Sequence, residues 1–166
     1  MRLLLTILAL LWLSPPALAA ELLPGARIAF LGLVFLDTST EGAYNGVRED
    51  ETARVALLED LIVQRFSEEG IRFMDLAPIA KKLENTVNPA NCYGCDVRMG
   101  KALGADFILV GVVQKVSNLI ISMNLVLRDV ETGETVRARS VDVRSNTDQS
   151  WSRGMRYILK TAFFKE

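Results

Sequence analysis

Two cysteines separated by two residues form the pattern with the clearest chemical potential. Cys92 and Cys95 follow a loop rich in helix breakers and directly precede a short predicted helix. Such a pair can form a disulfide in an oxidising compartment, and a helix N-terminus favours the thiolate needed for thiol–disulfide exchange. Thioredoxin-like motifs follow the first strand of a βαβ unit, which this pair does not. We therefore predict a structural disulfide, with a redox-active pair as the alternative.

A polar loop after the first predicted strand is the second candidate site. Ligands usually bind at the carboxyl ends of strands in open α/β sheets. The candidate ligand-binding or interaction residues in this loop are Asp37, Thr38, Ser39, Glu41 and Tyr44. The loop matches no calcium-binding spacing, and the GxGxxG and GxxxxGK phosphate motifs are absent. The alternative is a solvated connection, and we predict no cofactor.

The chain contains no histidine, which removes much catalytic chemistry. Ser-His-Asp and Cys-His catalysis and histidine metal sites are excluded, and two cysteines alone make a poor zinc site. Two acidic groups, residues 49–51 and 68–69, lie at predicted helix ends, where acids normally sit in solvent. Neither is predicted to be a catalytic pair. We therefore expect no catalytic residues, no metal site and no enzymatic activity.

The charge balance limits the classes of partner, and the N-terminal segment indicates the cellular location. The chain has 19 Lys and Arg against 20 Asp and Glu and no basic stripe, which argues against nucleic acid or an anionic membrane as partner. Residues 1–20 have the pattern of a cleavable secretion signal, with a cut after Ala19 or Ala20. No cysteine stands directly after the cut, so a lipid anchor is not expected. We predict a soluble periplasmic protein, with an uncleaved anchor as the alternative.

Hydrophobic periodicity predicts one α/β (α+β) domain over residues 21–166. The apolar segments 27–36 and 106–116 are typical of buried strands, and the alternation over 119–129 places Leu119, Ile121, Met123, Leu125 and Leu127 on one face. Short strands are also predicted at 71–74 and 135–143, and helices at 50–69, 75–84, 96–103 and after 148. The result is a mixed sheet of about five strands with helices packed on it.

Two features of the C-terminal part allow both a structural and a functional interpretation. Trp151, at the start of the last helix, could anchor a partner, but it also fits the apolar stripe that predicts core packing. Arg137, Arg139 and Arg144 lie on or near one strand. They could protect a sheet edge by charge, or they could form an anion-binding or partner surface.

Several segments resemble a bacterial family of secreted proteins of unknown function (DUF2380/DUF3280-like). They are Gly104–Asp106 before an apolar strand, Gln114–Ile120, Arg128–Gly133 and Asn146–Trp151. The cysteine pair and the Asp37 loop fit the same pattern. The candidate interaction-surface residues within these segments are Gln114, Lys115, Asn118, Asn146, Asp148 and Trp151.

More distantly, the order of Leu-Gly-Ala-Asp, two strands and Asp-x-x-Thr-Gly is similar to envelope domains of the TolB N-terminal, CsgG and LpoB-like kinds. This resemblance implies a mixed α/β domain that acts by protein–protein contact, without catalysis. The closer family resemblance implies a link to periplasmic quinoprotein alcohol oxidation. We therefore predict a non-catalytic periplasmic accessory protein that binds an envelope protein. A redox-responsive protein and a small-molecule-binding domain are the alternatives.

Overall fold

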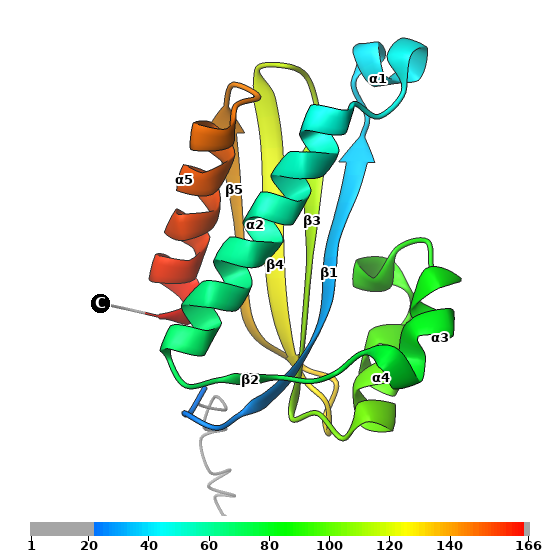
Figure 1. Ribbon diagram of the computed structural model, residues 1–166, viewed down its shortest axis with the longest axis vertical. Helices are drawn as coiled ribbons and strands as arrows, with labels where there is room; N and C mark the ends of the chain where they lie inside the picture. Colours follow the sequence, from blue (N-terminus) through cyan, green and yellow to red (C-terminus); the bar gives the residue numbers. More distant parts are fainter. Residues whose placement is uncertain (1–21, 165–166) are drawn as a thin grey trace, which may run out of the picture.

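Five strands form one mixed sheet in the order β2-β1-β3-β4-β5, which confirms the predicted fold class (Figure 1). The computed structural model describes residues 22–164, so the predicted signal peptide lies outside the described residues. The strands are β1 Arg27–Asp37, β2 Arg72–Phe73, β3 Phe107–Lys115, β4 Ile120–Asp129 and β5 Thr135–Arg144. β1 runs parallel to β2 and β3, whereas β3, β4 and β5 are antiparallel neighbours.

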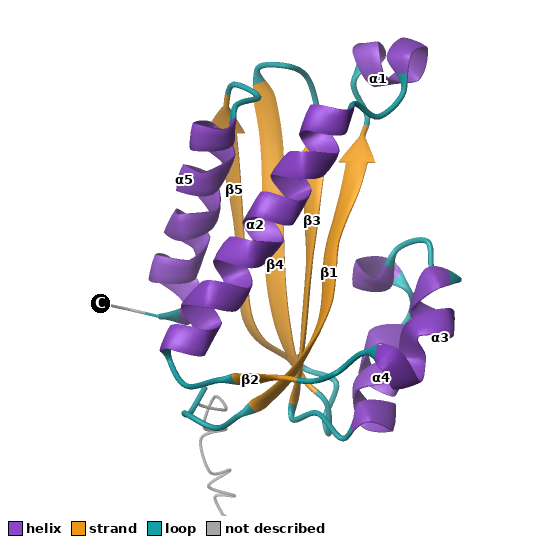
Figure 2. Ribbon diagram, viewed as in Figure 1, coloured by secondary structure: helices purple, strands orange, loops and turns teal. Residues whose placement is uncertain are grey.

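Helices cover both faces of the sheet (Figure 2). The α-helices are α1 Thr40–Asn45, α2 Glu49–Glu68, α3 Ala80–Glu84, α4 Cys95–Leu103 and α5 Asp148–Ile158, and a π-helical turn, Leu159–Phe163, extends α5. One core lies between the sheet and the apolar stripes of α2 and α5, centred on Leu58, Ile62 and Phe66. A smaller core on the opposite face joins α4 to the first half of β1 and β3.

A β-bulge divides β1 into two halves. The register passes from Phe30 opposite Leu109 to Leu33 opposite Gly111, so β1 carries one residue more than β3. Gly32 adopts φ +87°, which a residue with a side chain rarely tolerates. The N–H of Leu33 donates to Glu59 Oε1 of α2 at 2.7 Å. The bulge is therefore fixed to the helix that covers it.

The elements differ from the sequence prediction at two places that matter for the site. The polar loop after β1 contains the short helix α1, because Ser39 accepts a hydrogen bond from the N–H of Gly42 and caps it. Leu119 was expected on the buried face, but β4 begins only at Ile120 and Leu119 is 71% exposed in the hairpin turn. None of the helices within residues 22–164 has the length and apolar character needed to cross a membrane.

Candidate functional site

Most of the predicted site residues meet at one end of the domain. The carboxyl ends of β1 and β3 lie there beside the N-termini of α2 and α5, and α1 projects beyond them (Figure 1). The register that pairs Asp37 with Lys115 joins the candidate loop to the family segment that begins at Gln114. Residues separated by more than a hundred positions thus form one polar region.

The centre of this region is a buried lysine surrounded by three carboxylates. Lys115 Nζ lies 2.7 Å from Glu51 Oε1, 3.3 Å from Asp37 Oδ2 and 3.4 Å from Glu41 Oε2. The side chains of Lys115 and Glu51 are 1% and 0% exposed, whereas that of Glu41 is 32% exposed. Asn146 Nδ2 also donates to Glu51 Oε1, at 2.7 Å. We call Asp37, Glu41, Glu51 and Lys115 the buried ionic cluster.

Two sequence predictions fail at the buried ionic cluster. Lys115 is fully buried and therefore does not contribute to an interaction surface. Its position on β3 continues the alternating series of core residues that packs against α2. The acids at residues 49–51 were expected in solvent, but Glu51 is fully buried. Glu51 stands four residues before Val55 and seven before Leu58, on the stripe of α2 that faces the sheet. That position was the signal that could have identified it.

The charges of the cluster stabilise one another. Burial by itself lowers the pKa of Lys115, but its contacts with Glu51 and Asp37 outweigh this effect and raise the pKa above its usual value. Burial likewise favours the neutral form of Asp37, yet hydrogen bonds from Ser39 and the Lys115 ammonium hold the pKa of Asp37 below its usual value. The ammonium and the Asp37 carboxylate are therefore both charged at neutral pH. Their role is to hold the loop on the sheet.

A second polar network lies next to the first and is centred on Arg54 of α2. Its guanidinium donates to Asp50 at 2.9 Å, to Asp148 at 2.8 Å and to Asn146 at 3.3 Å. The same group lies 5.9 Å from the ring centroid of Trp151, which is fully buried and packs against Phe35. Arg54 thus ties the N-terminus of α5 to α2. Sequence reasoning did not identify Arg54.

The remaining predicted residues divide between structural and exposed positions. Trp151 belongs to the core, as its stripe predicted, so it is not an interaction-surface residue. Gln114 donates to the Thr38 hydroxyl, which itself donates to the Lys115 carbonyl oxygen. Asn118 is exposed in the turn between β3 and β4. Among the candidate residues of the loop, only Tyr44 presents a large apolar side chain to solvent, and it is 84% exposed.

Helix α1 is held tightly although it projects from the sheet. Asp37 Oδ1 accepts hydrogen bonds from the N–H and the hydroxyl of Ser39, at 2.9 and 2.6 Å. A side chain at Gly42 would place its Cβ 2.2 Å from the Asp37 carboxyl carbon, so only glycine allows this approach. The buried ionic cluster therefore fixes the position from which Tyr44 projects.

Exposed apolar side chains stand on several segments at this end of the domain. We call them the apical surface. They come from the end of β1, from α1 and its connection to α2, and from the β3–β4 turn. The members are Leu36, Tyr44, Val47, Val116, Leu119 and Ile120. Large apolar side chains that gather in solvent often mark a site of protein contact.

The cysteine pair lies away from the apical surface and forms the predicted disulfide. Cys92 and Cys95 are bonded to each other, and Cys95 is the first residue of α4 and packs in the smaller core. The bond joins the turn Pro89–Asn91 to the start of α4. No group of three or more Cys, Asp or Glu side chains within residues 22–164 is arranged to hold a metal ion.

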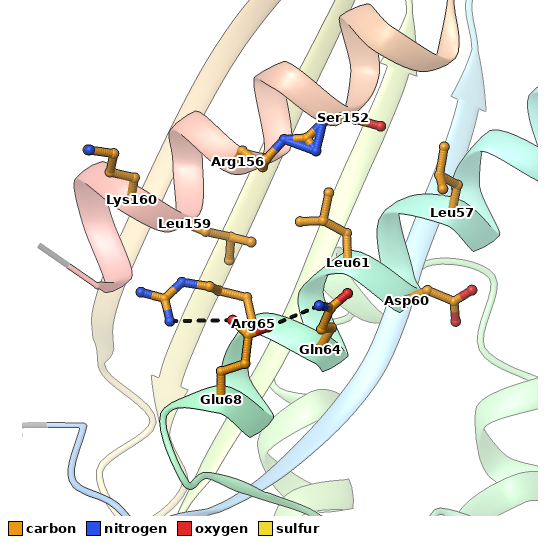
Figure 3. A pocket seen from close by; sticks show the side chains of 10 residues that line it. All are labelled: Leu57, Asp60, Leu61, Gln64, Arg65, Glu68, Ser152, Arg156, Leu159 and Lys160. Atoms are coloured by element: carbon orange, nitrogen blue, oxygen red, sulfur yellow. Dashed lines mark hydrogen bonds and ion pairs between the residues drawn. The ribbon is translucent and has the colours of Figure 1, made fainter. Parts of the chain in front are cut away.

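Two surface hollows lie away from the predicted ligand loop. A groove of about 520 Å³ follows the seam between α2 and α5, with Leu57, Leu61 and Leu159 among its lining residues (Figure 3). Its α2 rim is internally paired, because Gln64 donates to Glu68 and Arg65 contacts Glu68 and Glu69. A second hollow, of about 430 Å³, lies beside β5. Neither is lined by Asp37, Thr38, Glu41 or Tyr44.

Known structures share this fold at low sequence identity. The LpoB C-terminal domain from Salmonella enterica aligns with a TM-score of 0.53 and 12% identity, over 74% of this chain and 85% of that one. The same domain from Escherichia coli gives 0.51 and 14%, over 76% and 88%. Lipoprotein GNA1162 from Neisseria meningitidis gives 0.50 and 16%, over 74% and 83%.

No curated protein matches the chain. A protein-family model matches residues 26–163, which include all five strands and the five α-helices. The resemblance recognised in the sequence is thereby confirmed. The chain belongs to the family DUF3280, described as a protein of unknown function (DUF2380).

Proposed function

We propose that this protein is a non-catalytic periplasmic accessory protein that binds another envelope protein through its apical surface. One observation carries the proposal: Tyr44 and Leu119 project from an end of the domain that the buried ionic cluster holds in place. Contact through rigid apolar side chains costs little conformational entropy on binding, which favours affinity. A solvated polar connection would need neither the apolar side chains nor the ionic cluster.

The other properties of the chain support contact rather than catalysis. The chain has no histidine, and the carboxylates of the candidate loop turn inward to Lys115 instead of toward an open cavity. The predicted secretion signal supports a periplasmic location. The resemblance to LpoB-like and TolB-like domains supports a function in which one envelope protein recognises another.

Site-specific crosslinking in intact cells would test this proposal. A photoreactive phenylalanine analogue placed at Tyr44 or Leu119 should form a defined adduct with one envelope protein, identified by mass spectrometry. The matched control position is Tyr93, which is 97% exposed but lies between the two cysteines. Equal adducts from Tyr44 and Tyr93, or none from Tyr44 and Leu119, would refute the assignment of the apical surface.

Binding by purified proteins would then measure the contribution of the surface. The resemblance makes a periplasmic quinoprotein alcohol dehydrogenase the first partner class to test, and a cell-wall synthase the second. Truncation of an interface anchor typically costs about 2 kcal/mol or more, so Tyr44→Ala should weaken binding about thirtyfold. Tyr93→Ala should leave the dissociation constant unchanged.

A further inference from the structure

The outer edge of β5 has the features of a binding site for an extended peptide. β5 pairs with β4 from Thr135 to Arg144, and no strand among residues 22–164 pairs with its other side. Along an edge strand, alternate residues direct their N–H and C=O groups away from the sheet, where they can pair with an added strand. This edge is ten residues long, whereas β2 at the opposite edge has two.

The arginines on this edge outnumber its single acid, Asp142, and lack carboxylate partners. Arg137, Arg139 and Arg144 form no ion pair with any carboxylate of the described residues, whereas Arg27, Arg48, Arg54, Arg65 and Arg128 all do. The nearest acids along the chain are Glu134, just before β5, and Asp142, on the face of the sheet opposite α5. The edge therefore attracts anionic groups.

The side chains of the two central arginines are held in place by weak partners. The Arg139 guanidinium lies 5.4 Å from the ring centroid of Tyr157 and donates to its hydroxyl at 2.8 Å. Arg137 donates to the carbonyl oxygen of Val136 at 3.4 Å. A carboxylate forms a much stronger, bidentate contact with a guanidinium than either partner provides. Both arginines therefore remain able to bind one.

A hollow runs beside the same stretch of β5. Its volume is about 430 Å³, and its lining comes from residues 136–139 of the edge strand and residues 161–163 of the final π-helical turn. An added strand would lie along this hollow. Arg137 and Arg139 stand two residues apart and hence on one face of β5, while Ala138 and Ser140 leave room on the other face.

We infer that the β5 edge binds an extended segment of a partner protein with acidic residues at alternate positions, which adds to the sheet as a further strand. Side chains directly opposite each other on adjacent strands are about 5 Å apart, so alternate carboxylates would meet Arg137 and Arg139. The edge is separate from the apical surface, so this inference does not depend on the proposed function.

A pair of synthetic peptides tests the inference. One peptide of about nine residues alternates Glu with Val and Thr, and the other has the same composition with its Glu residues grouped. The alternating peptide should bind at least about tenfold more tightly, measured by fluorescence anisotropy. It should also slow amide hydrogen exchange in β5 of the intact protein. Equal binding of the two peptides, or unchanged exchange in β5, would overturn the inference.

Charge-reversal variants on β5 and on α5 distinguish a specific binding site at the β5 edge from non-specific attraction by the net positive charge. The double variant Arg137→Glu with Arg139→Glu should bind the alternating peptide at least about tenfold more weakly. The matched control is Arg153→Glu with Arg156→Glu, which makes the same charge change on exposed positions of α5 and should weaken binding less than about threefold. Equal losses of affinity in both double variants would overturn the inference, because the peptide would then be bound by non-specific electrostatic attraction alone. Binding to vesicles containing anionic phosphatidylglycerol, without binding of the peptide, would also overturn the inference, because the partner would then be a membrane.

Discussion

Replacing Lys115 by methionine should destabilise the protein strongly, because it leaves carboxylates buried without their cation. Removing one partner of a buried ion pair typically costs about 3–5 kcal/mol. The Glu41 side chain is 32% exposed, so water reaches one side of the cluster and we expect the lower figure, about 3 kcal/mol. For a domain of this size, that loss lowers the melting temperature by about 6–12 °C.

The pH dependence identifies the cause of this loss. In the native protein, the contact of Asp37 with Lys115 stabilises the fold above the usual carboxyl pKa and is lost as the pH falls through the lowered pKa of Asp37. The raised pKa of Lys115 stabilises the fold below its usual value, and this contribution is lost only at strongly alkaline pH. In Lys115→Met, the Asp37 carboxylate loses the cation that opposes the effect of its burial, so the pKa of Asp37 should rise. The variant should therefore recover stability as the pH falls from 7 toward about 4.

Urea unfolding at several pH values would measure both effects. The control is Lys82→Met, which changes an exposed lysine of α3 and should alter the unfolding free energy by less than about 0.5 kcal/mol. Adding Glu51→Gln to Lys115→Met should restore part of the loss, because the most deeply buried unpaired charge is removed. The reasoning is refuted if Lys115→Met costs less than about 1 kcal/mol at pH 7, or if its cost is the same at pH 4 and pH 7.

Substitutions at two other sites test separate structural claims. Glu59→Gln should preserve the hydrogen bond from Leu33 and remove a carboxylate whose pKa is raised by burial, so its unfolding free energy at pH 7 should equal or exceed that of the native protein. Glu59→Leu should lose about 1–2 kcal/mol in the same urea titration, because the N–H of Leu33 is left unpaired. Joint replacement of Cys92 and Cys95 by serine should cost at most about 2 kcal/mol, since the disulfide closes a very small loop. A reduction potential below about −300 mV would identify this bond as structural, and one near −270 mV would favour a redox role instead.

The sheet and the long helices could be predicted because their side chains follow simple periods. Ile121, Met123, Leu125 and Leu127 alternate and are all fully buried, as that alternation predicts. Strand ends were harder, because Leu119 continues the apolar pattern but lies beyond the last backbone pair of β4. Apolar periodicity reports which side chains could be buried, whereas the turn decides where the strand begins: the Ser117 hydroxyl accepts from the N–H groups of Leu119 and Ile120.

The sequence identified several residues of the candidate site, but it did not predict how they pack together. Asp37 and Lys115 were both identified, but as groups available to a ligand or partner. The sequence separates Glu51 from Lys115 by 64 positions, and only the packing of α2 on β3 brings the two charges together. A charged residue on the inward stripe of a helix, and another at the inward position of a strand, were the two signals to combine. Arg54 lacked such a signal, because two of its partners, Asn146 and Asp148, are 92 and 94 positions away and only the packing of α5 beside α2 brings them near.

The bulge at Gly32 decides more than the shape of one strand. Side chains alternate along a strand, so the additional residue reverses which side of the sheet every later residue of β1 faces. Without the bulge, regular pairing of the same residues would turn Asp37 away from Lys115 and place Leu36 opposite it. The pairing of charges at the end of β1 thus depends on a count of residues. Deletion of Gly32 would remove the bulge and leave the pairing in register, whereas deletion of one residue between the bulge and Asp37 would break it without altering any member of the cluster.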